Sequence, residues 1–200
     1  MILTPEQQKN VLDGAMQVFT TTRLRDISLE NLSRASGVQA FDIVRHYQSR
    51  ENILTAVLER ELELMAMAAH EPTLRFPGET LKDELHVLAG VILQEYRSRL
   101  PFLRQVLAES MQDAELGALF YRTFIVQGRL LFAEFLKQRE ALSELREGVD
   151  VEAAGAIFLA ALTGALWMVE VFGGNKVEAL DDDRLIAEIS EVFVDGVRRR

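Results

Sequence analysis

The residues with the clearest capacity for binding chemistry lie between positions 39 and 50. Arg45 and Arg50 provide guanidinium groups, which pair well with the phosphate oxygens of nucleic acid. Phe41 can contact the methyl group of thymine, and Asp42 can accept a hydrogen bond from N4 of cytosine. Alternatively, Phe41 packs locally and Asp42 caps its helix, and the sequence leaves both interpretations open. These residue types predict a DNA-contacting surface over residues 39–46.

Two short helices joined by a sharp turn are expected to position this surface. Ser28 is a suitable N-cap for the first of them. Gly37 can adopt the left-handed conformation that a tight turn between helices requires. The second short helix covers roughly residues 39–46, and an amphipathic helix that ends near residue 20 precedes the pair. This order predicts a tri-helical helix-turn-helix whose last helix enters the major groove.

Composition favours helices throughout the chain. Hydrophobic residues make up 48% of the sequence, which contains only 12 glycines, four prolines and no cysteine. Thr4 and Gln7 form a potential capping box around Pro5 at the start of the first helix. The absence of cysteine fits a reducing compartment, and the N-terminus lacks the basic flank and apolar core of a signal peptide. We therefore expect an all-α, cytoplasmic protein.

The charge of the chain differs between its two parts. The 200 residues include 31 acidic and 22 basic side chains, for a formal net charge of −9. Residues 1–50 contain six basic and five acidic groups, for a net charge of +1, so the other residues carry −10. The negative charge therefore lies away from the predicted DNA surface, where it discourages unspecific binding to phosphates.

The first 54 residues resemble the DNA-binding domain of the TetR-type (TetR/AcrR) family of transcriptional regulators. The resemblance rests on Phe19, Ser28-Leu29, Leu32-Ser33, Ser36-Gly37-Val38, Ile43, His46-Tyr47, Ser49-Arg50-Glu51 and Ile53-Leu54. It implies a helix-turn-helix domain over residues 1–48, in a repressor that binds a palindromic operator in double-stranded DNA as a homodimer and is released by a small apolar effector. The predicted DNA-contacting residues are Ser28, Gln39, Ala40, Phe41, Asp42, Arg45, His46, Tyr47 and Arg50.

Several positions depart from the family pattern. Arg23 stands where the family has glycine, and Gln39 stands where it has serine. Val44 replaces a tyrosine that commonly contacts phosphate, and Asp42 adds a negative charge to the predicted DNA surface. An alternative prediction is therefore a helical ligand-binding or protein-interaction module whose helix-turn-helix no longer binds DNA.

The remaining residues, 49–200, are predicted to form a helical ligand-binding and dimerisation domain, which brings the chain to about nine helices. Pro72, Pro77 and Gly78 indicate a loop after the helix that begins at Ser49. Further helices are expected over residues 80–99, 101–110, 113–138, 151–172 and 181–199. The effector is expected to contact Met65, Phe102, Arg104, Met111, Phe120, Tyr121, Phe124, Gln127 and Trp167, although such residues are also typical of plain core.

The segment 153–169 is apolar except for Thr163. Because a membrane-spanning helix needs about 20 residues, this segment predicts a helix buried on all sides by protein and no membrane partner. Its small residues allow another helix to approach closely, so we predict a homodimer interface, with packing inside one chain as the alternative. The expected interface residues are Ala156, Ala160, Gly164, Leu185, Ile189, Val192 and Phe193.

Patterns typical of enzymes and metal sites do not occur in the sequence. His46, His70 and His86 lack the spacing of metal ligands on a helix. There is also no glycine-rich phosphate loop and no G-x-S-x-G nucleophile motif. The sequence therefore predicts no catalytic residue, no metal ligand and no cofactor.

Overall fold

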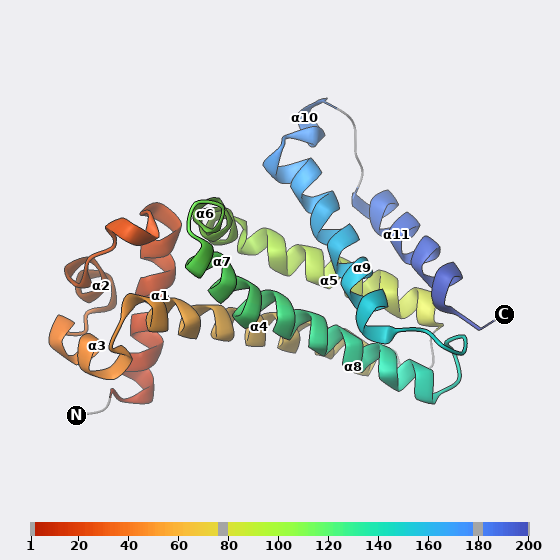
Figure 1. The fold of residues 1–200 in the computed structure, drawn as a ribbon, viewed down its shortest axis with the longest axis horizontal. Helices are drawn as coiled ribbons and strands as arrows, with labels where there is room; N and C mark the ends of the chain where they lie inside the picture. Colours follow the sequence, from red (N-terminus) through yellow and green to blue (C-terminus); the bar gives the residue numbers. More distant parts are fainter. Residues whose placement is uncertain (1–2, 76–79, 178–181, 200) are drawn as a thin grey trace. The chain divides into compact units, whose positions relative to one another are not determined.

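The computed structural model describes residues 3–75, 80–177 and 182–199, and helices dominate them (Figure 1). These residues contain no strand, only an isolated bridge between Leu145 and Arg198. The predicted all-α class is confirmed. The α-helices are α1 (Pro5–Thr21), α2 (Leu29–Ser36), α3 (Ala40–Tyr47), α4 (Arg50–Arg75), α5 (Leu81–Ser98), α6 (Leu100–Ser110), α7 (Ala114–Phe120), α8 (Gln127–Ala141), α9 (Val151–Leu166), α10 (Gly174–Val177) and α11 (Asp182–Val197).

Three further helical segments differ in type from these. A 3-10 turn, η1 (Leu24–Asp26), lies between α1 and α2. Two π-helical segments, η2 (Tyr121–Val126) and η3 (Trp167–Val171), directly follow α7 and α9. The chain divides into two compact units, the first formed by Met1–Glu63 and Arg99–Val126, and the second by Leu64–Ser98 and Gln127–Arg200.

In the first unit, α1 packs closely against α2, and α2 packs against α3. Gly14 makes this approach possible, because a Cβ atom there would lie 2.8 Å from the backbone nitrogen of Ser36. Gly37 has a φ of 70°, the left-handed conformation predicted for the turn. The apolar side chains Val11, Ala15, Phe19, Leu32, Ile43, Val57 and Leu58 are buried. We call residues 3–48, which contain α1 to α3, the head.

Two sets of contacts join α6 to the head within this unit. Phe102 of α6 stacks on Phe19 of α1, with 6.3 Å between ring centroids. The buried carboxylate of Glu61 in α4 pairs with Arg99, which precedes α6, and with Arg60, both at 2.9 Å. Arg60 in turn pairs with Asp13 of α1 at 2.7 Å. An apolar stack and a chain of ion pairs thus connect α1, α4 and the start of α6.

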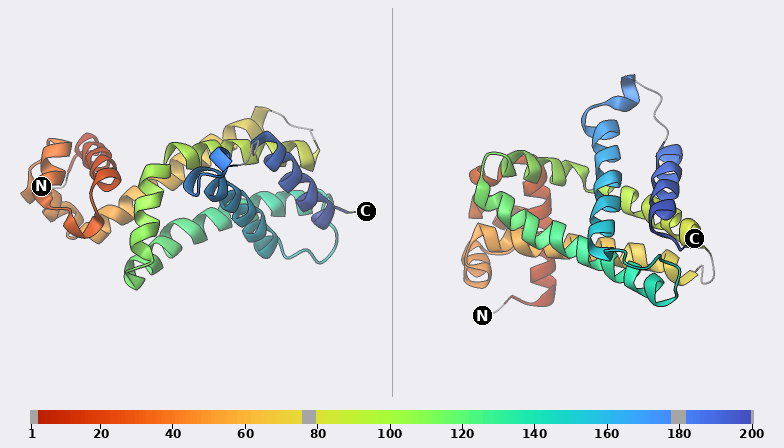
Figure 2. Two further views of the ribbon diagram at one scale, coloured as in Figure 1. Left: turned by 90° about the horizontal axis from the view of Figure 1, so that it is seen from above. Right: turned by 45° about the vertical axis from the view of Figure 1, so that its right-hand side comes forward.

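In the second unit, one face of α9 packs against α8, α5 and α11. α9 and α11 lie side by side in both views of Figure 2. Phe158 of α9 stacks on Phe132 of α8 at 5.0 Å and contacts Phe193 of α11 at 4.9 Å between ring centroids. The buried Glu84 of α5 forms an ion pair with Arg139 of α8. Aromatic packing at the centre and one buried ion pair hold these helices together.

The structure corrects three local expectations. α4 continues through Pro72 to Arg75, because a proline in the last turn removes only one backbone hydrogen bond from a long helix; Pro77 and Gly78 lie outside the described residues. The helix expected over residues 113–138 contains the π-helical segment η2, which a 3.6-residue period does not indicate. A short helix, α10, follows the predicted end of the apolar helix at Gly173-Gly174.

The apolar helix is also less buried than predicted. Among the described residues, one helical segment is long and apolar enough to cross a membrane by length and composition, Val151–Val171, and 33% of its best window is buried. Ile157 and Met168 are exposed, so the expectation of burial on all sides is wrong for the single chain. The segment lies at the surface of its unit, where only one of its faces packs against neighbouring helices.

Candidate nucleic-acid interface

The helix α3 is fixed in the head by one buried anchor, Ile43. At its C-terminal end, Tyr47 is half-buried and the ring of His46 packs edge-on against it, with 4.6 Å between centroids. Burial raises the pKa of the Tyr47 hydroxyl above its usual value. The carbonyl oxygen of Tyr47 accepts hydrogen bonds from the backbone N–H of Ser49 and from Nδ2 of Asn52, at 2.8 and 2.7 Å. These contacts fix the junction between α3 and α4.

The opposite face of α3 is open to solvent. Phe41 is 71% exposed and therefore does not pack locally, which removes one of the two interpretations left open by the sequence. Asp42 is half-buried in the first turn of α3, and the side chain of the N-cap residue, Gln39, makes no capping hydrogen bond. Arg45 is exposed on the next turn from Phe41, and Ala40 is half-buried beside Phe41. The exposed side chains of Phe41 and Arg45 therefore make no packing contribution inside the head.

Most basic side chains of the head are already paired. Lys9, Arg23 and Arg34 form ion pairs with acidic side chains one helical turn away or less: Asp13, Asp26 and Glu30. Nη1 of Arg50 donates to the backbone oxygen of Ile27 at 3.3 Å. The exposed side chain of Arg45 makes no ion pair with the described residues. It is the cation best placed to meet a phosphate.

The other predicted DNA-contacting residues have local roles as well. Ser28 is the N-cap of α2, and its hydroxyl accepts the backbone N–H of Asn31 at 3.2 Å. The hydrogen bond from Arg50 to Ile27 joins the start of α4 to the residue before this cap. The start of α4, at Arg50, is thus tied to the start of α2, at Ser28.

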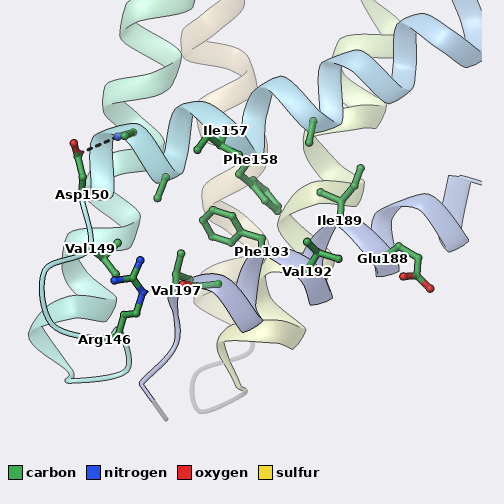
Figure 3. Close-up of a pocket in the computed structure, with 14 residues that line it drawn as sticks. Arg146, Val149, Asp150, Ile157, Phe158, Glu188, Ile189, Val192, Phe193 and Val197 are labelled. Carbon is green, nitrogen blue, oxygen red and sulfur yellow. Dashed lines mark hydrogen bonds between the residues drawn. The ribbon is translucent and has the colours of Figure 1, made fainter.

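Three of the predicted dimer residues line a surface groove in the second unit, whereas Ala156, Ala160, Gly164 and Leu185 lie outside its lining. The groove has a volume of about 590 Å³ and lies between α9 and α11 (Figure 3). Ile189, Val192 and Phe193 contribute to its lining, but Phe193 is buried against Phe158 and belongs to the core of the unit. Arg146 and Glu188 lie at opposite ends of the lining in Figure 3. The groove is therefore apolar along its length, with Arg146 and Asp150 toward one end and Glu188 at the other.

Exposed apolar and small residues extend this surface along α9. Ile157 is 67% exposed and Val192 of α11 is 70% exposed. Ala160 and Gly164 are exposed on the same side of α9, while Ala156 is half-buried. The sequence prediction for this face of α9 rested on its small residues and therefore did not include Ile157.

The residues predicted for effector binding are distributed over both units. In the first unit, Phe102, Phe120 and Phe124 are buried, and the last two stack with 5.4 Å between centroids. Arg104, Met111 and Tyr121 are exposed. In the second unit, Met65 is buried, Trp167 is half-buried and Gln127 is exposed. The structure thus brings Phe120 and Phe124 together and gives Phe102 a packing partner in Phe19.

In the part of the chain that the structure describes, no group of three or more histidine, aspartate and glutamate side chains could hold a metal ion. One long-range structural contact differs from these predicted residues. The carboxylate of Glu109 in α6 accepts the backbone N–H of Leu24 in η1, a contact between residues 85 positions apart. No local pattern indicates such a contact.

Comparisons with known proteins agree with this architecture. A search of curated proteins gave no significant match. Among solved structures, a TetR-family transcriptional regulator from Mesorhizobium loti aligns with a TM-score of 0.79 and 15% identity, covering 98% of this chain and 100% of that one. The fatty acid degradation regulator FadR from Bacillus halodurans aligns with a TM-score of 0.70 and 14% identity over 100% of both chains. The flavonoid-responsive regulator FrrA gives a TM-score of 0.70 and 21% identity, covering 98% of this chain and 100% of that one.

The structural matches by themselves show the fold. The sequence shows to which family the chain is related, because residues 88–196 match the family of AefR-like transcriptional repressor C-terminal domains. This match covers more than half of the chain and follows a head with the helix order of a helix-turn-helix. The matched family and the structural relatives are named as transcriptional regulators. The chain belongs to the TetR family of transcriptional regulators.

Proposed function

We propose that this chain is a cytoplasmic, ligand-responsive repressor that binds a palindromic operator as a homodimer. Each protomer inserts α3 into the major groove of one half-site. A small apolar effector in the helical domain binds the two states of the dimer unequally, which is the only way a ligand can shift their balance. The effector favours the state with low operator affinity, and the DNA is released.

The observation that best supports DNA binding is the open face of α3. Phe41 and Arg45 extend from a helix that is anchored through Ile43, and neither side chain has a role inside the head. A cation without an ion-pair partner beside an exposed aromatic ring suits a surface that meets both phosphates and bases. The acidic remainder of the chain limits unspecific attraction, so docking depends on this small face.

The groove between α9 and α11 supports the homodimer. Its exposed Ile157 and Val192 are apolar, and an exposed apolar surface on a regulator suits a protein interface. A two-fold interface brings one patch against its own copy in the opposite direction. Arg146 at one end of the groove would then face Glu188 of the partner protomer at the other end, while Asp150 at the Arg146 end accepts backbone N–H groups of its own chain, those of Glu152 and Ala153.

An apolar effector is supported by the stacked rings of Phe120 and Phe124. One structural relative is named as flavonoid-responsive and another as a regulator of fatty acid degradation, and both names refer to compounds with large apolar parts. Trp167 is the single tryptophan of the chain. Its fluorescence provides a direct reporter for titrations with flavonoids and fatty acids.

The test of the proposed function is a binding measurement with purified protein. DNA fragments selected from a random duplex library are labelled, and their affinity is followed by fluorescence anisotropy at increasing salt. We expect a two-fold symmetric consensus, loss of affinity as salt rises, and a loss of about tenfold or more for Arg45→Ala. Arg34→Ala is the matched control, because Arg34 is exposed but paired with Glu30.

Failure to select any sequence, at low salt as well as high, would contradict this proposal. That outcome would favour the alternative, a helical module that binds ligands or proteins without DNA. The negative charge of Asp42 on the outer face of α3 is the residue-level feature that favours this alternative.

A further inference from the structure

The outer face of α3 has an unusual order of side chains. At about 100° per residue, Phe41 and Arg45 lie at the centre of the solvent-facing side, four residues apart. Val44 flanks them on one edge and Asp42 on the other. The face therefore runs from apolar, through aromatic and cationic, to anionic across the width of one helix.

The apolar half of this face is exposed without a partner in the chain. Phe41 is 71% exposed and Val44 is 38% exposed. Elsewhere in the head, the large apolar side chains Phe19, Leu32 and Ile43 are buried. Since an exposed ring gains nothing for folding, the pair is available to cover another apolar group.

The major groove offers one apolar group to such a pair. Among the four bases, only thymine presents a methyl group there, on C5, while the other groove positions present hydrogen-bond donors and acceptors. An aromatic ring and a branched aliphatic side chain cannot pair with those donors and acceptors. Phe41 and Val44 thus match a C5-methyl group and no other standard feature of the groove.

Asp42 adds a second element of selection. The described residues give its carboxylate no hydrogen-bond or ion-pair partner. A carboxylate accepts hydrogen bonds from the amino groups of bases and is repelled by phosphate oxygens and by the acceptor atoms of guanine. Its charge therefore weakens binding to DNA in general and leaves affinity dependent on the bases that α3 meets.

We infer that α3 recognises its half-site through thymine C5-methyl groups, contacted by Phe41 and Val44, next to a base that offers an amino group to Asp42. This inference rests on the proposed function, since it names the chemistry of the DNA that the same surface binds. The protein then distinguishes its operator from other DNA by contacts to thymine and not by contacts to phosphate. 5-Methylcytosine carries the same C5-methyl group, so the experiment must distinguish binding to thymine from binding to 5-methylcytosine.

The experiment uses the full-length protein and a selected symmetric duplex. Each thymine of a half-site is replaced in turn by deoxyuridine, which removes the C5-methyl and leaves base pairing intact. We expect the affinity to fall about fourfold for each contacted methyl group. In the Phe41→Ala protein, which binds the thymine duplex about tenfold more weakly, uracil and thymine duplexes should bind equally at the step that Phe41 contacts.

Two control proteins sharpen the comparison. Phe41→Leu keeps an apolar side chain and should retain most of the sensitivity to uracil. Phe172→Ala removes an aromatic ring that is 74% exposed but lies in the second unit, so its affinity should not change.

The experiment distinguishes failure of this inference from failure of the proposed function. If no duplex is selected, the chain does not bind specific DNA and the proposed function itself is wrong. If a duplex is selected but uracil binds as tightly as thymine at every position, the protein binds DNA and only this inference is overturned. A site that contains cytosine at the Phe41 step and binds better when that cytosine is methylated would overturn the assignment to thymine.

Discussion

The carboxylate of Glu109 in α6 accepts the backbone N–H of Leu24 with both oxygens, at 2.8 and 3.0 Å. Leu24 begins the 3-10 turn that connects α1 to α2. Nε2 of Gln105 donates to the same carboxylate at 2.6 Å, so the acceptor is itself held in place. One charged side chain of α6 thus fixes the connector that leads into the helix-turn-helix.

Replacing Glu109 with alanine should destabilise this connector. The N–H of Leu24 would lose its acceptor, at a cost of about 1–3 kcal/mol. Amide hydrogen exchange measured by NMR should show faster exchange at Leu24, and urea unfolding should show the loss of free energy. Glu140→Ala is the control, since that carboxylate is exposed. Unchanged exchange at Leu24 would show that the hydrogen bond is not maintained in solution.

The close packing of α1 on α2 should not tolerate a side chain at Gly14. A Cβ atom there would lie 2.8 and 2.9 Å from backbone atoms of Ser36 and Ala35, which cannot move without separating the helices. Gly14→Ala should lower the free energy of unfolding by about 1–3 kcal/mol. Gly90→Ala in α5 meets nothing within 4 Å and should raise it by about 0.5–1 kcal/mol. Chemical denaturation measures both, and equal effects would argue against the close approach.

Removal of the buried carboxylate of Glu61 should have a large effect. Glu61→Ala leaves the guanidinium groups of Arg60 and Arg99 without their shared acceptor inside the protein. We expect a loss of about 3–5 kcal/mol in urea unfolding. Breaking the exposed pair of Glu30 and Arg34 with Glu30→Ala should change stability by less than about 0.5 kcal/mol. Similar losses for the two variants would mean that Glu61 is solvated.

A charge on the α9 surface should prevent self-association. In a two-fold interface, Ile157→Glu places two negative charges on a shared apolar patch, where they are desolvated and repel each other. Light scattering coupled to gel filtration should show monomers for this variant and dimers for the parent protein. The helical circular dichroism should not change. Met67→Glu, at another exposed apolar position, should remain dimeric.

Alkaline pH should unfold the protein partly through Tyr96. Burial raises the pKa of its hydroxyl to about 12 from an ordinary value of 10.0. The unfolded chain releases this proton first, so the stability contributed by the neutral hydroxyl is complete below pH 10 and falls as pH rises toward 12. Tyr96→Phe should reduce the loss of stability over this interval, measured by urea unfolding at several pH values. An equal loss in both proteins would assign the effect to other groups.

Local sequence rules predicted the helices well where the determining contacts are themselves local. The capping box of Thr4 and Gln7 is formed, and Gly37 adopts its left-handed turn. The bond from Glu109 to Leu24 could not be predicted, because it depends on how α6 packs against the head. The exposure of Ile157 also escaped prediction, since hydrophobicity along one helix does not tell which neighbours cover it. For the candidate interface, the sequence predicted the short helix α3, but the exposure of Phe41 and the hydrogen bond from Arg50 to Ile27 depend on packing.

The π-helical segment η2 affects how this chain should be aligned with its relatives. A π turn contains one more residue than an α turn, so it absorbs an inserted residue as a local widening. The core positions that follow, such as Phe132 and Leu136, keep their inward direction, whereas an uncorrected insertion would rotate each of them by about 100°. The number of residues between Phe120 and Phe132 is therefore free to differ by one among homologues with the same core. We therefore expect a one-residue length difference in this region to fall within Tyr121–Val126.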